Sequence, residues 1–421
     1  MTSRWTAGAL ALLLLLSGCG AAPKPPTGTP ATGTTPGATP GAPAPTATTG
    51  SSPDMADAKG PEVFTAAEFA PLLAAYLNAG GTEPATARLT ALYDRWCGGQ
   101  APAHGRQWAE ADLNGDGVNE LLTAVGGFQT GNPGEAAWGL LVIAGQPGQW
   151  HVDLLELPRQ DVGFFYGAKL LGTPDLDDTG KPVMVWQLVT AVGATGGPTQ
   201  IVAARWAPGS VEQLGAPVRM PNMRTATLDG TVLAVNGGVT GGASGGAWQR
   251  LRTDRFRWEQ GQFRLIDREF APSSLIYHRL QDGIVAETLG RTQDAAAAYK
   301  DAAAPGAPVV ANPHQLQQPD QAKTFGAAIR SLAQLRLGAL QLNLGDAHSA
   351  RQVLLSGQGP FAGLTAAASE AASAEEACRR AEAWAADHAE FFKALALPAG
   401  YGNPTWAPGR LCGPITFEGL E

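Results

Sequence analysis

The sequence predicts an α+β protein in which an antiparallel β-rich domain, led by two short helices, precedes an all-α domain of helical hairpins. Three observations support this fold class. Apolar residues recur at helical spacing from 65 to 96, short apolar runs broken by Gly and Pro fill most of 112–272, and the remainder is rich in Ala at helical spacing. No helical crossovers separate the apolar runs, so we expect an antiparallel sheet.

The N-terminal segment has the order of an export signal. Arg4 supplies a positive charge, an apolar run extends from Ala7 to Leu16, and Ser17-Gly18-Cys19 follows. The run is about half as long as a membrane-spanning helix. Residues 16–19 resemble the lipobox of bacterial lipoproteins, which implies a mature chain that begins at a lipid-modified Cys19 and is anchored to a bacterial membrane, outside the cytoplasm, on the periplasmic or cell-surface side. The alternative is an ordinary secretory signal with a chance cysteine.

Residues 20–60 are almost entirely Pro, Thr, Gly, Ala and Ser. Without periodic apolar residues to bury, this segment is expected to be a disordered tether. The remaining chain is long enough for two domains with their own cores, which we place at 61–272 and 273–421. The formal net charge is −8 and Lys and Arg do not cluster, so nucleic acid is not an expected partner.

Two helices are expected at the start of the first domain. Thr65 and Glu68 form a capping-box pattern ahead of an apolar stripe that begins at Phe69. A second helix has Pro84 in its first turn and ends before Gly98. The strands expected after them are the hairpins 138–143 with 150–155 and 256–258 with 263–265, and the single runs 183–189 and 201–206.

One short segment carries side-chain oxygens at its first, third, fifth and ninth positions. The four residues are Asp112, Asn114, Asp116 and Glu120. A hard cation such as Ca²⁺ needs several oxygens that converge at short range, and a tight turn at Gly117 can direct them inward. The segment is not an EF-hand, because Thr123 replaces the bidentate Glu and a strand at 121–125 replaces the second helix.

The same segment resembles the calcium loops of integrin-type FG-GAP (VCBS) repeats, in which an Asp/Asn-rich loop joins strands of a propeller blade. The resemblance implies that Asp112, Asn114, Asp116 and Glu120 bind a structural Ca²⁺ through their side chains and that Val118 binds it through its carbonyl. The alternative is an Asp/Asn/Gly turn held by its own hydrogen bonds.

A second copy of the loop runs from Asp175 to Val183 and also precedes an apolar strand. Thr179 replaces an aspartate and Val183 replaces the glutamate, so two ligands are weakened or lost there. A closed propeller needs at least about four blades, whereas only two copies are clear. We therefore expect related hairpin units without a closed ring.

Two groups of residues in the second domain have matching spacing. They are Gly283, Gly290, Ala295 and Tyr299, and Gly338, Gly345, Ala350 and Leu354. Small residues permit close contact between paired helices, and the larger last residue fills the gap. The pattern resembles tetratricopeptide repeats over about 275–357, which implies docking of a peptide or protein partner. A proline-containing segment at 305–319 separates the units, and a plain helical bundle without a partner groove is the alternative.

Three cysteines follow Cys19, namely Cys97, Cys378 and Cys412. An exported compartment permits disulfides, and three thiols leave one unpaired. We favour Cys378 with Cys412, because the tail that contains Cys412 has glycines and prolines that let it fold back onto the last helix. The alternative is no disulfide.

No catalytic constellation is evident in the sequence. Gly242–Gly246 formally satisfies the serine-hydrolase elbow, but Trp248–Trp258 after it has a strand pattern where the elbow needs a helix. The six histidines have no zinc-protease spacing, and His388 falls on an apolar face of a last helix expected from Ser373 to about Leu397. We therefore expect a non-enzymatic binding or scaffold protein, with an unrecognised hydrolase as an alternative.

Tryptophan is unusually frequent in the strand-rich region. The residues are Trp108, Trp138, Trp150, Trp186, Trp206, Trp248 and Trp258. If they were exposed together on one sheet face, they would form a platform that stacks on the sugars of a cell-wall glycan, and core packing is the alternative.

Overall fold

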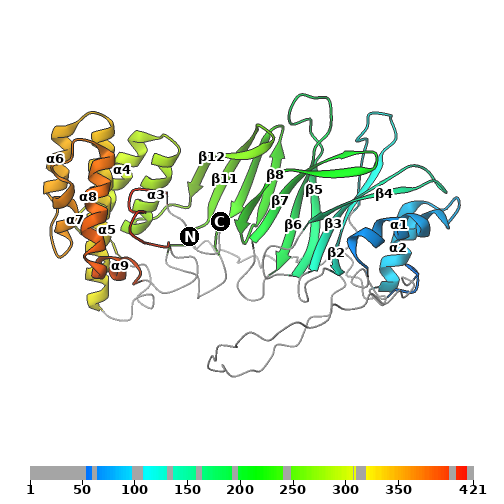
Figure 1. Cartoon of the computed structure of the whole chain (residues 1–421), viewed down its shortest axis with the longest axis horizontal. Helices are drawn as coiled ribbons and strands as arrows, with labels where there is room; N and C mark the ends of the chain where they lie inside the picture. The colour runs from blue at the N-terminus through cyan, green and yellow to red at the C-terminus, as the bar shows by residue number, and fades with distance from the viewer. Residues whose placement is uncertain are drawn as a thin grey trace, which may run out of the picture. The chain divides into compact units, whose positions relative to one another are not determined.

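The computed structural model describes residues 54–58, 64–96, 108–129, 136–157, 164–191, 198–239, 248–306, 308–309, 319–397 and 404–414. The predicted signal with Cys19, most of the tether and Cys97 lie outside these residues. The described part contains helices and three four-stranded antiparallel sheets, so the α+β class is confirmed (Figure 1).

The chain divides into two compact units, one of 1–170 with 204–213 and the other of 171–203 with 214–421. The last sheet and the helices after it therefore belong to one unit. The predicted domain boundary at 272 stays a prediction. Within the described residues, no helix is long and apolar enough to cross a membrane.

The two leading helices are confirmed as α1 (Ala66–Asn78) and α2 (Ala85–Trp96). The capping box at the start of α1 is complete, because the Glu68 N–H donates to Thr65 Oγ1 at 3.3 Å and the Thr65 N–H donates to Glu68 Oε2 at 3.0 Å. Both helices bury an apolar stripe against the first sheet.

The first sheet has the order β1 (Ala109–Ala111), β2 (Glu120–Gln129), β3 (Ala136–Ala144) and β4 (His151–Leu157). The predicted hairpin of β3 and β4 is confirmed, with Ile143 opposite Val152. Alternate residues of β2 and β3 face the two helices, as the period of two along a strand requires. Asn78 at the end of α1 binds the backbone of Trp150 twice, at 3.0 and 2.6 Å, and so joins the helix to the start of β4.

A short described segment precedes the predicted boundary at 61. Residues 54–58 form a turn in which Met55 and Ala58 are buried in the core under α1 and α2. Two isolated apolar residues in a stretch of Pro, Thr and Ser have no periodicity, so the sequence pattern could not distinguish them from the tether.

The other two sheets are also simple meanders. The second has the order β5 (Phe164–Gly172), β6 (Met184–Ala191), β7 (Pro198–Ala207) and β8 (Ser210–Pro221), and the third joins β9 (Thr225–Asp229), β10 (Val232–Gly237), β11 (Arg252–Glu259) and β12 (Gln262–Phe270). The predicted hairpin of β11 and β12 is confirmed, with Trp258 opposite Phe263 and positive φ angles at Gln260 and Gly261. In this third sheet β12 is an edge strand.

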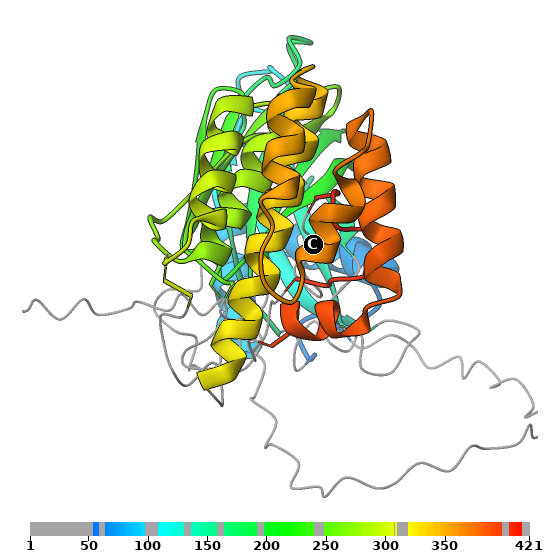
Figure 2. The same ribbon diagram turned by 90° about the vertical axis from the view of Figure 1, so that its left-hand side faces the viewer.

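The described helices after β12 run side by side in Figure 2. They are α3 (Ile276–Thr288), α4 (Thr292–Ala303), α5 (Pro319–Asn343), α6 (Ala347–Leu355), α7 (Ala362–Ala368), α8 (Ala374–Ala386) and α9 (Ala389–Leu395). The prediction of one last helix to Leu397 is wrong, because His388 leaves helical geometry (φ −127°, ψ 69°) and separates α8 from α9. The His388 ring instead stacks on Trp384, and its Nδ1 lies 2.6 Å from the Trp384 carbonyl oxygen.

The C-terminal segment folds back onto the helices. Cys378 in α8 and Cys412 form a disulfide, the pairing that the sequence favoured. Next to Cys412 in the chain, the buried Leu411 has its N–H bound to Glu382 Oε1 at 3.1 Å and its carbonyl bound to Arg336 Nε at 2.7 Å. Arg336 also donates to the Gly413 carbonyl through Nη2. The tail is therefore held by a covalent bond, an apolar side chain and several polar contacts.

Candidate functional site

The loop of Asp112, Asn114, Asp116, Val118 and Glu120 connects β1 to β2 of the first sheet. Gly115 and Gly117 have φ angles of 79° and 83°, a left-handed conformation that glycine adopts without strain. Leu113 is buried and fastens the loop to the sheet. The loop is therefore a compact turn whose polar side chains are directed by its backbone.

The aspartate carboxylates of the loop accept backbone hydrogen bonds. Asp112 accepts from Gly115 through Oδ1 at 2.7 Å and from Gly117 through Oδ2 at 2.9 Å. Asp116 accepts from the Val118 N–H through Oδ1 at 2.7 Å. These contacts are the Asx hydrogen bonds of the alternative prediction.

Glu120 brings a buried carboxylate under this loop. Its side chain accepts from the Leu113 N–H through Oε2 at 2.7 Å and from Asn114 Nδ2 through Oε1 at 3.2 Å. The same Asn114 nitrogen donates to Asp116 Oδ2 at 2.9 Å. Two carboxylates therefore converge on one positively polarised amide group.

The electrostatics of Asp112 and Glu120 differ because their surroundings differ. The hydrogen bond from the Gly117 N–H is the main reason why the pKa of the exposed Asp112 is lowered. Burial is the main reason why the pKa of Glu120 is raised, and the negative charges of Asp116 and Asp112 raise it further. A positive charge among these carboxylates would favour the ionised form of Glu120.

The donor set of the loop fits a hard cation in its chemistry, because the donors are oxygen atoms only and three of the residues are carboxylates. In the described part of the chain, however, no group of three or more His, Cys, Asp or Glu side chains is gathered so that it could hold a metal ion. The loop carboxylates are turned instead to N–H groups. Val118, whose carbonyl the resemblance assigns as a ligand, has an exposed side chain.

The second copy of the loop has the same local structure. Asp175 accepts from the Gly180 N–H at 2.7 Å, as Asp112 accepts from Gly117, and its other contact is with the Thr179 N–H at 3.1 Å, one position later than the contact of Asp112 with Gly115. Asp178 and Gly180 have positive φ angles at the positions of Gly115 and Gly117. Val183 is fully buried where the first copy has Glu120, so the second loop keeps the turn and lacks the buried carboxylate.

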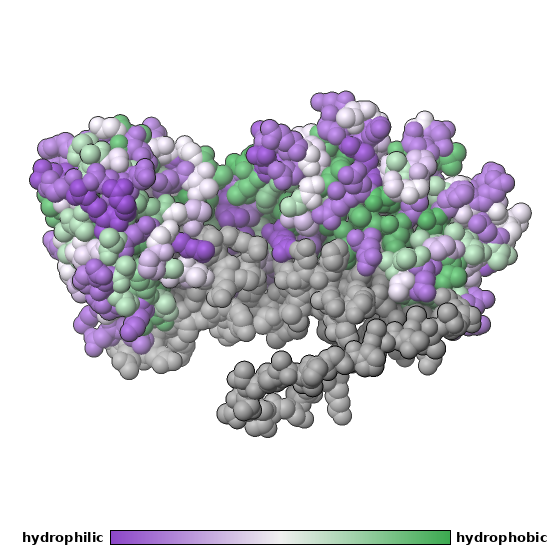
Figure 3. All heavy atoms as spheres, in the orientation of Figure 1, coloured by the Kyte–Doolittle hydropathy of each residue, from purple (hydrophilic) through white to green (hydrophobic). Residues whose placement is uncertain are grey.

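The two helical units also have the contact that their spacing predicts. Gly283 in α3 faces Tyr299 in α4, and Gly338 in α5 faces Leu354 in α6. The loop glycines of both units have positive φ angles, and both matched alanines are fully buried. Hydrophilic residues are spread over the visible face of these hairpins (Figure 3).

The described tryptophan side chains of the strand-rich region do not form an exposed platform. Trp186, Trp206, Trp248 and Trp258 are buried, and Trp108 and Trp150 are half-buried. The side chain of Trp138 lies outside the described part. The glycan alternative therefore lacks, among these residues, the exposed aromatic face that it requires.

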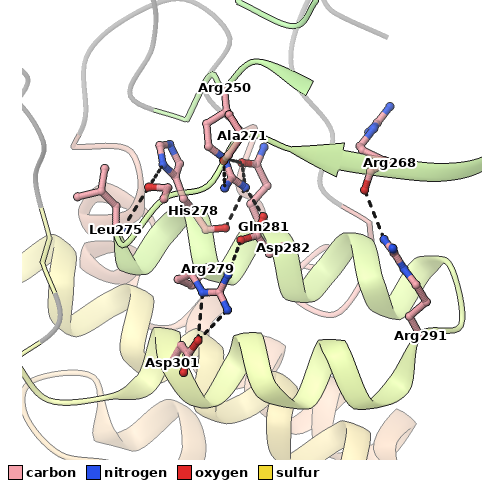
Figure 4. Close-up of polar contacts among 11 residues, drawn as sticks. Arg250, Arg268, Ala271, Leu275, His278, Arg279, Gln281, Asp282, Arg291 and Asp301 are labelled. Carbon is pink, nitrogen blue, oxygen red and sulfur yellow. Dashed lines mark hydrogen bonds and ion pairs between the residues drawn. The ribbon is translucent and has the colours of Figure 1, made fainter. Parts of the chain in front are cut away.

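A polar cluster around Arg250 was not anticipated from the sequence (Figure 4). The buried Arg250 guanidinium binds Asp282, the Gln281 side chain at 3.1 Å and the His278 carbonyl at 3.1 Å. His278 in turn lies 2.8 Å from Ser273 through Nδ1. The Ser273 Oγ also accepts from the Leu275 N–H, so this serine lies in the turn that precedes α3. The Ser–His pair is joined to the Arg250 cluster through the carbonyl of His278.

The elbow-like Gly242–Gly246 lies outside the described residues. No family model, curated protein or solved structure matches the chain. The FG-GAP-like and tetratricopeptide-like features therefore rest on the residues described above.

Proposed function

We propose that the chain is a non-enzymatic, membrane-anchored binding module of the bacterial cell envelope, with a structural Ca²⁺ in the loop between β1 and β2. The observation that carries the calcium part is the convergence of Asp116 and the buried Glu120 on one amide of Asn114. Side chains of Asp112, Asn114, Asp116 and Glu120, with the Val118 carbonyl, would hold the ion. Bound there, Ca²⁺ would neutralise the three carboxylates and stabilise the folded state by linkage.

The helical hairpins supply the binding part of the proposal. Their matched contacts, Gly283 with Tyr299 and Gly338 with Leu354, support a tetratricopeptide-like repeat that docks a protein or peptide. The lipobox-like residues that end at Cys19 support a lipid anchor, and the tether after them would separate the folded part from the membrane surface.

Thermal unfolding of the full chain in detergent, in calcium and in chelator, tests the calcium part. We expect calcium to raise the melting temperature by about 3 °C or more, and we expect an Asp112→Ala, Asp116→Ala variant to lose this rise. A matched Asp175→Ala, Asp177→Ala variant should keep the rise in melting temperature. This variant removes the same type of turn contact, but from the second copy of the loop, which has Val183 in place of the glutamate. Absence of a rise in the wild type, or its persistence in the Asp112 variant, would refute the calcium site.

Membrane fractionation tests the anchor. The wild type should partition with membranes and yield a lipid-modified mature N-terminus by mass spectrometry. A Cys19→Ser variant should lose the modification and appear in the aqueous fraction. Membrane attachment of that variant would show that the anchor lies elsewhere.

A further inference from the structure

A cavity of about 390 Å³ lies between the end of the edge strand β12 and the hairpin of α3 and α4. This volume is within the range of about 300–1,000 Å³ that is typical of small-molecule sites. Each of the three elements contributes one arginine and one carboxylate to the lining. The pairs are Arg268 with Glu269, Arg279 with Asp282, and Arg291 with Asp294.

The lining arginines are held in place by ion pairs. Arg268 donates to both oxygens of Asp254, at 2.7 and 2.8 Å. Arg279 donates to Asp301 at 2.7 Å and to Asp282 at 3.0 Å. In Figure 4 the Arg268 side chain points away from α3 and α4 and its carbonyl oxygen faces Arg291, so Arg279 is the one of these two whose guanidinium faces the hairpin. Its ion pairs fix that guanidinium before any ligand arrives, which lowers the entropy cost of binding.

The third lining arginine, Arg291, binds the edge strand β12. Arg291 lies 3.1 Å from Asp267 through Nη1 and donates to the Arg268 carbonyl through Nη2 at 3.4 Å. Figure 4 shows this side chain reaching from the start of α4 to β12. The cavity is therefore bounded by side chains that connect the strand to the helical hairpin.

Three aspartates that hold the lining arginines are each shared with a second arginine. Asp254 also binds Arg252, Asp267 also binds Arg255, and Asp282 also binds Arg250. Asp301 adds a second carboxylate for Arg279, and Glu269 adds one for Arg255, so the charges around the cavity are balanced overall. The exposed Arg291 shares Asp267 with Arg255 and uses one N–H on Asp267 and another on the Arg268 carbonyl, which leaves further N–H donors for an anionic group. A planar carboxylate matches the fork geometry of arginine.

The remaining lining adds negative charge and apolar surface. The Glu269 side chain is 70% exposed and forms an ion pair of 3.6 Å with Arg255. Asp294 is also exposed and is the lining carboxylate that is accessible to a cation from solvent. Phe270 and Val285 supply apolar surface in the same cavity. Cationic, anionic and apolar groups thus occur together within the reach of one small ligand.

We propose that this cavity binds a zwitterionic ligand of amino-acid or dipeptide size. Its carboxylate lies against Arg291, its ammonium group against Asp294, and its apolar side chain against Val285. This site goes beyond the proposed function, because it depends neither on the calcium loop nor on the lipid anchor.

Isothermal titration of the full chain in detergent tests the proposal with leucine, alanyl-leucine, N-acetylleucine amide and inorganic phosphate. We expect leucine or alanyl-leucine to bind with one-to-one stoichiometry, and the better of the two identifies the ligand as an amino acid or a peptide. The uncharged amide and phosphate should bind at least about ten-fold more weakly. Equal binding of the amide or of phosphate, or no binding of either zwitterion, would overturn the proposal.

Two variants locate the site. Arg291→Gln should weaken binding of the zwitterion by about ten-fold or more, whereas Arg351→Gln, which alters an exposed ion pair with Glu370 on α6, should leave it unchanged. Asp294→Asn removes an exposed charge and should weaken binding of leucine even if Arg291→Gln proves unstable. Unchanged affinity in Asp294→Asn and in a folded Arg291→Gln would refute this location.

Discussion

The ring of Tyr299 in α4 lies against the backbone of Gly283 in α3, and a Cβ atom on Gly283 would come within 2.4 Å of Tyr299 Cε1. Leu354 in α6 has the same relationship to Gly338 in α5, where a Cβ atom would come within 2.6 Å of Leu354 Cγ. In each hairpin, the absence of a side chain at the glycine lets a large residue of the second helix approach the first helix.

Gly283→Ala is therefore expected to destabilise the protein. Alanine normally stabilises a helix relative to glycine by up to about 1 kcal/mol, so a purely local effect would have the opposite sign. Because the new methyl group would overlap the Tyr299 ring, we expect the free energy of unfolding to fall by about 1–3 kcal/mol. Urea denaturation measures the change.

A double-mutant cycle provides the control for this prediction. Tyr299→Ala leaves a cavity and is destabilising by itself, but it also removes the atoms that Gly283→Ala would strike. The double variant should consequently be more stable than the sum of the single effects predicts. Strict additivity would show that the Tyr299 ring does not limit the size of residue 283.

The parts of the fold that the sequence predicted well are those in which partners lie close together in the chain. The capping box of Thr65 and Glu68, the hairpin turn at Gln260 and Gly261, and the glycine spacing of the helical units are all of this kind. In each, the contact or turn is made within a short stretch of chain, and Gly261, Gly290 and Gly345 have the positive φ angles that glycine adopts without strain.

The parts that the sequence did not predict depend on partners that are distant in the chain. Asp254 in β11 binds Arg268 across the hairpin, and Asp282 in α3 binds Arg250 before β11, so neither pair has a spacing that marks it. The cavity beside α3 and α4 was missed for this reason. The loop from Asp112 to Glu120 could be predicted from the sequence because its side-chain oxygens lie within nine residues.

The Arg250 cluster should contribute substantially to stability. Arg250→Met leaves the carbonyl oxygens of Ala271 and His278 and the Gln281 side-chain oxygen without their arginine donor. We expect the free energy of unfolding to fall by about 3 kcal/mol. Arg255→Met is the matched control: this arginine is 42% exposed, and its ion pair with Asp267 should contribute less than about 1 kcal/mol. If both variants lowered the free energy of unfolding equally in urea denaturation, the buried Arg250 cluster would contribute no more to stability than an exposed ion pair.

Asp346 is expected to make the stability of α6 dependent on pH. It caps the helix by accepting the Ser349 N–H at 3.0 Å, and hydrogen bonds from Ser349 lower its pKa. Because the folded pKa lies below the unfolded value of about 3.9, the charged carboxylate contributes stability above that pH and loses it as the pH falls through the folded pKa.

The measurement for Asp346 is the urea midpoint of the wild type and of Asp346→Asn at neutral and acidic pH. Asparagine keeps the cap and removes the charge, so the wild type should be the more stable protein at pH 7 and the difference should vanish towards about pH 2. Asp346→Ala removes the cap itself and should stay less stable than asparagine at both values. If the difference in urea midpoint between the wild type and Asp346→Asn did not change with pH, the charge of Asp346 would not be the source of the pH dependence.

The disulfide between Cys378 and Cys412 should stabilise the protein without being needed for the position of the tail. The two cysteines are 34 residues apart in sequence, and the chain-entropy model assigns about 3–4 kcal/mol to a loop of this length. Arg336, Glu382 and the buried Leu411 hold the tail independently of this bond. A Cys378→Ser, Cys412→Ser variant should therefore have the same far-ultraviolet circular dichroism spectrum as the wild type. Its free energy of unfolding should be lower by about 3–4 kcal/mol. Reduction of the wild type should produce the same loss, whereas a Cys97→Ser variant should not. An unchanged urea midpoint after reduction would mean that the tail does not unfold together with α8.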